Sequence, residues 1–185
     1  IVREYVDHDP DKATAFDKFE KDFLADEKAG LFNETGTVVI DSLTTLCDAI
    51  MDCIKQKSQR LAGKAQLDDY MYLMGEVHGW CRKCMGLPCD FILTAHTTKD
   101  KDDITGQIIA AILMTGKAAD KLPALFDEWY VMQQVKDKYL VLTKPDGLYN
   151  AGTRMDIGHK FDKHEEPDLM KMRAKAGFPV THKGE

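Results

Sequence analysis

The stretch that most constrains the fold is residues 37–46, Thr-Val-Val-Ile-Asp-Ser-Leu-Thr-Thr-Leu. Its apolar, β-branched start predicts a strand buried on both faces, as in a parallel sheet. The strand ends abruptly at Asp41 and Ser42. Apolar residues then recur at steps of three and four, which predicts an amphipathic helix; they are Leu43, Leu46, Cys47, Ile50, Met51 and Ile54. We therefore expect Asp41 where a buried strand meets a helix.

Two interpretations of Asp41 follow from that position. In open α/β sheets ligands bind at the carboxyl ends of strands, and a carboxylate there commonly orders a magnesium ion bound to a nucleotide. Alternatively, Asp41 only caps the helix that follows it. Short apolar runs that end in Asp are frequent by chance, so the ten residues alone leave both interpretations open.

Composition narrows the class of protein. The chain has 185 residues, of which 44% are hydrophobic and 30% charged, as expected for one soluble globular domain over residues 1–185. Its longest apolar runs, such as residues 108–114, are too short to span a bilayer, so no membrane contact is expected. The net charge of −6 argues against non-specific coating of nucleic acid. The odd number of cysteines, five, predicts reduced thiols and a cytoplasmic location.

The remaining pattern predicts an α/β fold with parallel central strands and an antiparallel β extension. We expect helices over residues 13–29, 43–62, 66–85 and 167–176, strands over 2–6, 90–96, 126–134 and 138–143, a polar loop over 97–106, and short helix and turn over 108–121. The predicted second buried strand ends at His96, as the first ends at Asp41. Parallel strands deliver such groups to one crevice, where a histidine could sense a phosphate; a structural histidine is the alternative.

Two further motifs are weaker. Cys81 and Cys84, with Cys89 and the upstream His78, suggest zinc. However, Cys81 and Cys84 lie on the apolar stripe of a predicted helix and no second CxxC occurs, which favours buried structural thiols. Gly116 and Lys117 resemble the end of a phosphate loop, but Ala118 replaces the required Ser or Thr, so this is not a P-loop.

The ordered motifs do resemble a family. Residues 38–46 look like the magnesium-binding strand of RecA-like ATPases. The wider series resembles phage-encoded RecA-like P-loop ATPases, including those that act as single-strand annealing recombinases. The series comprises residues 3–5 (Arg-Glu-Tyr), 9–10 (Asp-Pro), 16–19 (Phe-Asp-Lys-Phe), 40–42, 68–70 (Asp-Asp-Tyr), 93–96 (Leu-Thr-Ala-His), 100–106, 115–117 (Thr-Gly-Lys), 122–128, 152–154 (Gly-Thr-Arg) and 175–177 (Lys-Ala-Gly).

The resemblance implies a RecA-like three-layer fold that binds ATP and Mg²⁺, assembles into rings or filaments, and acts in DNA recombination or replication in the host cell cytoplasm. In that case Asp41, with Ser42, orders the magnesium ion, Glu4 polarises the attacking water and His96 is the polar sensor. The loop over residues 97–106 would contact single-stranded DNA, and two cations would reach a neighbour's phosphates. The loop candidates are Thr97, Lys99, Lys101 and Thr105, and the cations are Lys117 and Arg154.

One family element is not in these 185 residues. The phosphate loop of the family should precede Ile1, and we expect it in a longer chain of which this is an N-terminally incomplete part. The rival hypothesis is a non-catalytic assembly or interaction module on an ATPase scaffold, because triphosphate without the loop's amides and Lys has no cradle. A small zinc-binding protein is a third hypothesis.

Overall fold

A computed structural model describes residues 1–9, 11–101, 106, 108–114 and 121–179. The chain divides into two compact units. The N-terminal unit comprises residues 1–96 and 113–119, and the C-terminal unit comprises residues 97–112 and 120–185. Helices and short strands are both present, so the mixed α/β class is confirmed at that level. The described sheets have two or three strands each.

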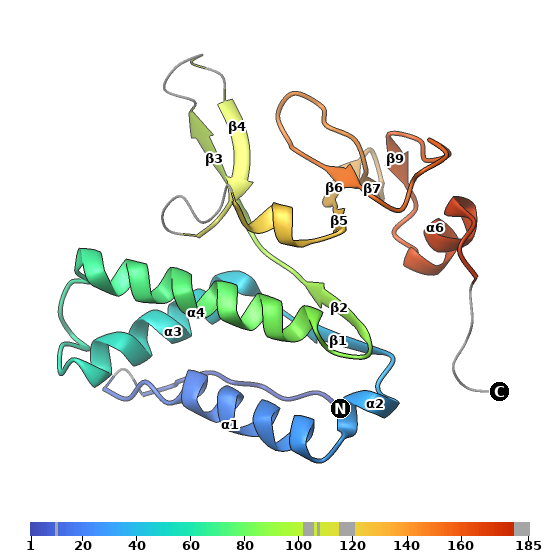
Figure 1. Cartoon of the computed structure of the whole chain (residues 1–185). Helices are drawn as coiled ribbons and strands as arrows, with labels where there is room; N and C mark the ends of the chain where they lie inside the picture. Colours follow the sequence, from blue (N-terminus) through green and yellow to red (C-terminus); the bar gives the residue numbers. More distant parts are fainter. Residues whose placement is uncertain (10, 102–105, 107, 115–120, 180–185) are drawn as a thin grey trace. The chain divides into compact units, whose positions relative to one another are not determined.

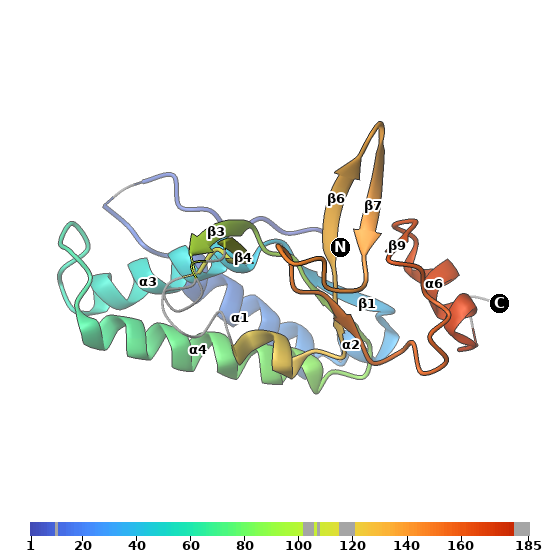
Figure 2. The ribbon, with the colours of Figure 1, turned by 90° about the horizontal axis from the view of Figure 1, so that it is seen from above.

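The N-terminal unit is mainly helical. It contains α1 (Ala15–Lys28), the short α2 (Leu31–Glu34), α3 (Leu43–Lys57) and α4 (Leu67–Met85), and α3 lies beside both α1 and α4 (Figures 1 and 2). The predicted helices over 13–29 and 66–85 are confirmed, whereas α3 stops five residues earlier than predicted. It ends there because the chain turns at Gln59, whose φ of 56° is incompatible with a continuing helix.

Aromatic residues fill the space between α1 and α4. Trp80 of α4 packs against Phe16, Phe19 and Phe23 of α1 with ring centroids 4.9–6.1 Å apart. Phe23 in turn packs on Phe32 of α2 at 4.8 Å. Such edge-on and tilted pairs add to the gain from burying large apolar side chains, so they fix how α1 lies on α4.

Two strands of the N-terminal unit run parallel to each other. β1 (Thr37–Ile40) pairs with β2 (Asp90–Leu93) in the register Thr37↔Asp90 to Ile40↔Leu93. The prediction that β1 is buried on both faces is wrong. Exposure alternates along β1, and Val39 is 54% exposed. Among the described residues β1 has a strand partner on one edge and is covered on one face, so its apolar run only partly faces a core.

The predicted strand over residues 2–6 does not form. Arg3 pairs with Asp26 of α1 at 2.6 Å, and Tyr5 donates a hydrogen bond to Asp22 of α1 at 3.1 Å. Asp7 accepts hydrogen bonds from the backbone N–H groups of Thr14 and Ala15 at the start of the helix. Side-chain contacts with a helix thus replace the strand ladder that β-branched residues predicted.

The sheets described in the C-terminal unit are short. β3 (Thr97–Lys101) pairs with β4 (Ile108–Ile112), and β5 (Glu128–Trp129) pairs with β8 (Gly152–Thr153), both antiparallel. β6 (Val131–Val135) and β7 (Lys138–Leu142) form the predicted hairpin, with β9 (His164–Glu165) on the other edge of β7 (Figure 2). A 3₁₀ helix, η1, covers Leu122–Leu125, and α6 covers Leu169–Ala176.

Two predictions are corrected here. Residues 97–101, predicted as part of a polar loop, form β3, and residues 108–112, predicted as helix and turn, form β4. Each segment forms a strand because it pairs with the other, and the composition of one segment alone does not indicate that pairing. The final helix is confirmed, although Asp168 rather than Pro167 opens it. The Asp168 side chain accepts from the N–H groups of Met170 and Lys171, and Gly177 ends the helix at a φ of 95°.

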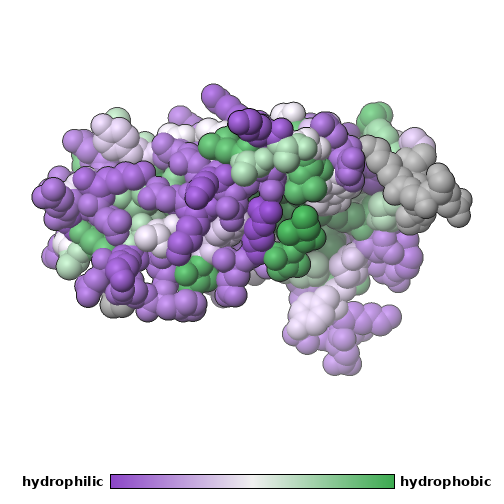
Figure 3. Space-filling model, turned by 90° about the horizontal axis from the view of Figure 1, so that it is seen from below, coloured by the Kyte–Doolittle hydropathy of each residue, from purple (hydrophilic) through white to green (hydrophobic). Residues whose placement is uncertain are grey.

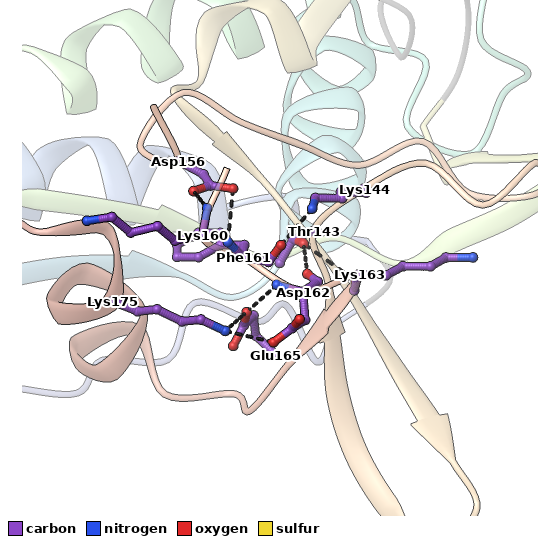
Figure 4. A network of polar contacts seen from close by, with 9 residues as sticks. All are labelled: Thr143, Lys144, Asp156, Lys160, Phe161, Asp162, Lys163, Glu165 and Lys175. Atoms are coloured by element: carbon purple, nitrogen blue, oxygen red, sulfur yellow. Dashed lines mark hydrogen bonds and ion pairs between the residues drawn. The ribbon is translucent and has the colours of Figure 1, made fainter. Parts of the chain in front are cut away.

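A polar network holds the segment after β8 to β7 and α6 (Figure 4). Asp156 is 7% exposed and accepts from the backbone N–H groups of Lys160 and Phe161 at 2.6 and 3.1 Å. The Thr143 hydroxyl donates to the Asp162 carbonyl at 2.7 Å, and Lys175 of α6 pairs with Glu165 at 2.6 Å. The apolar cluster of this unit, Val141, Phe161 and Met172, is thereby fixed in place.

The surface seen from the side of α1 is mainly hydrophilic, with hydrophobic residues gathered in separate patches (Figure 3). This agrees with the amphipathic pattern of α1, which buries Phe16 and Phe23 and exposes its charged residues. Among the described residues, none of the helices combines the length and the apolar character that crossing a membrane requires.

Candidate functional site

Asp41 lies at the carboxyl edge of the parallel pair β1–β2. It follows Ile40 directly, and its carboxylate is exposed. Thr94, the residue after β2, donates a hydrogen bond from its hydroxyl to Asp41 Oδ1 at 2.5 Å. The backbone continues the pairing here, because Thr94 N–H donates to the Ile40 carbonyl at 3.1 Å. The two strand ends thus present a carboxylate and a hydroxyl side by side.

The helix that follows does not need Asp41 as its cap. Ser42 is the N-cap of α3; its hydroxyl accepts from Thr45 N–H at 3.4 Å, and the Thr45 hydroxyl accepts from Ser42 N–H at 3.2 Å. Ser42 is 6% exposed, whereas Asp41 is exposed. The peptide bond between them is cis. The capping interpretation therefore applies to Ser42, whereas among the described residues the side chain of Asp41 accepts its hydrogen bond from Thr94.

His96 is tied to this edge through its backbone. Its N–H donates to the Thr44 hydroxyl of α3 at 3.2 Å, and its carbonyl accepts from Leu113 N–H at 2.8 Å. Leu43 N–H donates to the Thr94 carbonyl at 2.8 Å, which fixes the first turn of α3 against the end of β2. Asp41 and His96, singled out in the sequence, therefore belong to one edge of the N-terminal unit.

The chemistry of this edge suits a hard cation and phosphate. Mg²⁺ is usually held by one or two carboxylates together with water and substrate phosphates, so one exposed carboxylate beside a hydroxyl is a fitting donor set. The N-terminus of α3 lies at the same edge, and helix N-termini favour negative charge. In the part of the chain that the structure describes, no group of three or more His, Cys, Asp or Glu residues could hold a metal ion. A magnesium ion at Asp41 would therefore take its other ligands from water and phosphate.

The other predicted residues lie elsewhere. Glu4 is exposed between Arg3 and Tyr5, which both contact α1, and no described contact brings it to Asp41. Thr97, Lys99 and Lys101 are on β3 in the C-terminal unit and are exposed. Lys117 and Thr105 lie outside the described residues.

Arg154 is engaged within the C-terminal unit. Its guanidinium pairs with Asp127 at 3.1 Å and donates to the Ala124 carbonyl at 3.4 Å. Its side chain is still 63% exposed. Contact with a neighbour's phosphate would require Arg154 to leave Asp127, a weak surface pair that costs little to break.

Both cysteines of the Cys81–Cys84 motif have buried thiols, as predicted. Cys81 and Cys84 of α4 are buried, at 3% and 0% exposure. Burial raises the pKa of Cys81 to about 11 and that of Cys84 to about 12. Both thiols are therefore neutral near pH 7, whereas zinc binds the thiolate.

Sequence reasoning missed Thr94 and Thr44, which hold Asp41 and His96. A hydroxyl at the end of the second predicted strand, in Leu-Thr-Ala-His, was the available signal for Thr94. Thr44 gives no such signal, because its partners His96 and Leu113 are 52 and 69 residues away.

Comparison with known proteins identifies the family. The AAA domain family matches residues 3–155, which is most of the chain and includes Asp41, Thr94 and His96. No curated protein and no solved structure matches the chain. The match agrees with a nucleotide-binding role for the chain. The chain belongs to the AAA domain family, and its function is of the nucleotide-binding P-loop ATPase type.

Proposed function

We propose that this protein is a RecA-like ATPase, phage-encoded, that binds Mg²⁺ and ATP at the Asp41 edge and works on single-stranded DNA in recombination or replication. The observation that carries the nucleotide part is the Asp41–Thr94 hydrogen bond at the carboxyl edge of two parallel strands. Ligands of α/β sheets bind at such edges, and the family match supports the same class of ligand.

In this proposal each residue at the carboxyl edge of β1 and β2 has a separate role. Thr94 occupies Asp41 Oδ1, which orients the carboxylate and leaves Oδ2 for the magnesium ion and its water shell. Ser42 caps α3 and so holds the helix N-terminus beside the carboxylate. His96 stands at the end of β2 as the polar sensor. When bound, Mg²⁺ would neutralise charge that develops on the phosphates during in-line attack by water.

The DNA part of the proposal concerns β3. Residues 97, 99 and 101 alternate with residues 98 and 100 along the strand, so Thr97, Lys99 and Lys101 share one face. Lys101 pairs with Ile108, which is 55% exposed. Two lysines on one face of a strand can contact the phosphate backbone of single-stranded DNA. Ring or filament assembly would bring Arg154, and Lys117, to a neighbour's nucleotide; these roles and that of Glu4 remain predictions.

Asp41→Asn tests the nucleotide part in the native full-length protein. We expect Mg²⁺-dependent ATP hydrolysis to fall about 100-fold or more, because the amide removes the charge that orders the cation. The control is Asp52→Asn, which removes a carboxylate on α3 that pairs with Lys55 at 3.6 Å. Equal hydrolysis by the Asp41→Asn variant and the wild type would overturn the proposal.

One observation favours a second candidate, a non-catalytic assembly module on an ATPase scaffold. The 185 residues contain no GxxxxGK[ST] motif, so they do not themselves supply the usual phosphate cradle. Titration of the full-length protein with a fluorescent ATP analogue separates the two. Saturable, Mg²⁺-dependent binding supports the ATPase, and assembly without nucleotide binding supports the scaffold.

A further inference from the structure

The segment that carries β3 and β4 leaves and re-enters the N-terminal unit at one point. His96 directly precedes β3, and Leu113 directly follows β4. Leu113 N–H donates to the His96 carbonyl at 2.8 Å, next to the Thr97↔Ile112 pair that opens the ladder. The two stems of the β3–β4 hairpin are thus joined before the hairpin begins.

One side chain of α3 binds both stems. The Thr44 hydroxyl accepts from His96 N–H at 3.2 Å and donates to the Leu113 carbonyl at 3.4 Å. A hydroxyl has one proton to donate and lone pairs to accept with, so both roles can be filled at once. The contact with Leu113 is the longer and weaker of the two, and the bond from His96 therefore carries most of the argument.

The same turn of α3 is joined to the candidate nucleotide edge. Thr44 lies three residues after Asp41 and next to Leu43, whose N–H donates to the Thr94 carbonyl at 2.8 Å. Thr94 in turn donates to Asp41 at 2.5 Å. Hydrogen bonds and the short stretches of backbone between them therefore link the carboxylate of Asp41, through Thr94 and the first turn of α3, to the stems of the hairpin.

From this geometry we propose that Thr44 is a positioning residue, which makes the β3–β4 hairpin respond to the ligand at Asp41. The proposal rests on the proposed function, because it takes a Mg²⁺-nucleotide as that ligand. A bound cation attracts the Asp41 carboxylate, and Thr94 is hydrogen-bonded to that carboxylate. A shift of Thr94 in turn moves its carbonyl, which accepts from Leu43 N–H at the start of α3. Thr44 transmits that shift to His96 N–H, and hence to the strand that carries Lys99 and Lys101.

Two substitutions separate the hydrogen bonds of Thr44 from its bulk. Thr44→Val keeps the size and the β-branched shape but removes the hydroxyl, and Thr44→Ser keeps the hydroxyl. The far-UV circular dichroism and thermal midpoint of each variant show that it is folded. A positioning role predicts that Thr44→Ser behaves as the wild type and that Thr44→Val does not, whereas a purely packing role predicts the reverse order.

The experiment is amide hydrogen exchange in the full-length protein, with and without Mg²⁺ and a non-hydrolysable ATP analogue, at residues 97–101 and 108–112. We expect the analogue to change exchange rates there about 5-fold or more in the wild type and in Thr44→Ser, and less than about 2-fold in Thr44→Val. Binding of a fluorescent analogue is titrated in parallel, so that exchange is compared for all three proteins at saturating analogue.

Each result is decisive. An equal exchange response in Thr44→Val and the wild type overturns the role of Thr44, as does a wild-type protein that binds the analogue without any change at the hairpin. If the wild type binds no nucleotide at all, the titration shows it directly, and the proposed function falls together with the coupling that depends on it.

Discussion

Two carboxylates, one in each unit, show how the same side chain serves different ends. Asp156 is 7% exposed, and both of its oxygens accept backbone N–H groups, from Lys160 and Phe161. Asp41 is exposed and uses one oxygen, toward Thr94. A saturated, buried carboxylate organises the chain around it, whereas an exposed and half-used one is available for a ligand. The first two predictions below test that contrast.

The largest expected effect is on stability and separates the two carboxylates directly. Asp156→Ala leaves two backbone donors without their acceptor, so we expect it to lower the free energy of unfolding by about 3 kcal/mol. Asp41→Ala should lower it by less than about 1 kcal/mol, because its one hydrogen bond is solvent-exposed. Urea unfolding, followed by circular dichroism, measures both.

A surface acid of the same network is the control for Asp156. Asp162 is 81% exposed and pairs with Lys175 at 2.8 Å, so Asp162→Ala should change stability by no more than about 0.5 kcal/mol. If Asp162→Ala costs as much as Asp156→Ala, burial and backbone bonding do not distinguish the two, and the contrast with Asp41 loses its basis.

A second buried carboxylate extends the contrast to pH. Asp69 is 3% exposed, and the Arg60 guanidinium, followed by the Gln66 N–H, holds the pKa of its carboxyl below the ordinary value of 3.8. A carboxyl whose pKa is lower in the folded state stabilises the fold above its unfolded pKa, and this contribution is lost as pH falls through the folded value. Stability should therefore fall below about pH 4.

The Asp69→Asn variant isolates this part of the pH dependence. Its stability should be lower than that of the wild type at pH 6, and the difference between the two should shrink as pH falls toward 3. Asp68→Asn, a neighbouring substitution outside the Arg60 ion pair, should keep the wild-type slope. A constant difference between Asp69→Asn and the wild type across this range would show that ionisation of Asp69 does not stabilise the fold.

The elements that could be predicted from the sequence are those that depend on residues close together in the chain. α1, α4 and α6 follow from local periodicity, and the turn at Gly177 from the conformation that only glycine adopts freely. The β6–β7 hairpin has a two-residue connection, Lys136 and Asp137, and is equally local. Each of these elements carries its own evidence within a few residues.

The misassigned strands and the missed site residue involve partners far along the chain. The strand β3 reads as a polar loop by composition and forms only because β4 pairs with it. Residues 2–6 have strand composition but bind α1 through side chains. Asp41 was identifiable because strand, acid and helix are consecutive, whereas Thr94 is 53 residues away and its hydroxyl meets Asp41 only through parallel pairing. The sequence therefore predicted the carboxylate of the candidate site but not the hydroxyl that binds it.

A smaller effect compares helices of the two units through their glycines. Gly177 has a φ of 95°, and an added Cβ would lie 3.2 Å from Lys160 Nζ, so Gly177→Ala should cost about 1 kcal/mol. Gly75 lies inside α4, and an added Cβ there would meet nothing within 4 Å. Gly75→Ala should therefore stabilise by about 0.7 kcal/mol. Thermal unfolding measures both, and equal signs for the two changes would contradict these conformations.

The smallest expected effect is none, and it tests the zinc hypothesis. Because burial keeps Cys81 and Cys84 protonated near pH 7, displacing their protons for a metal would cost free energy that a preformed thiolate site does not require. Added Zn²⁺ or a chelator should then move the melting temperature by less than about 1 °C. The same should hold for Cys89→Ser, which removes the half-buried third cysteine.

Stoichiometric zinc in the purified protein, together with a melting temperature that falls on chelation, would instead mean that α4 opens to expose these thiols. The aromatic packing of Trp80 on α1 would have to open with it, so tryptophan fluorescence on adding the chelator reports the same event independently.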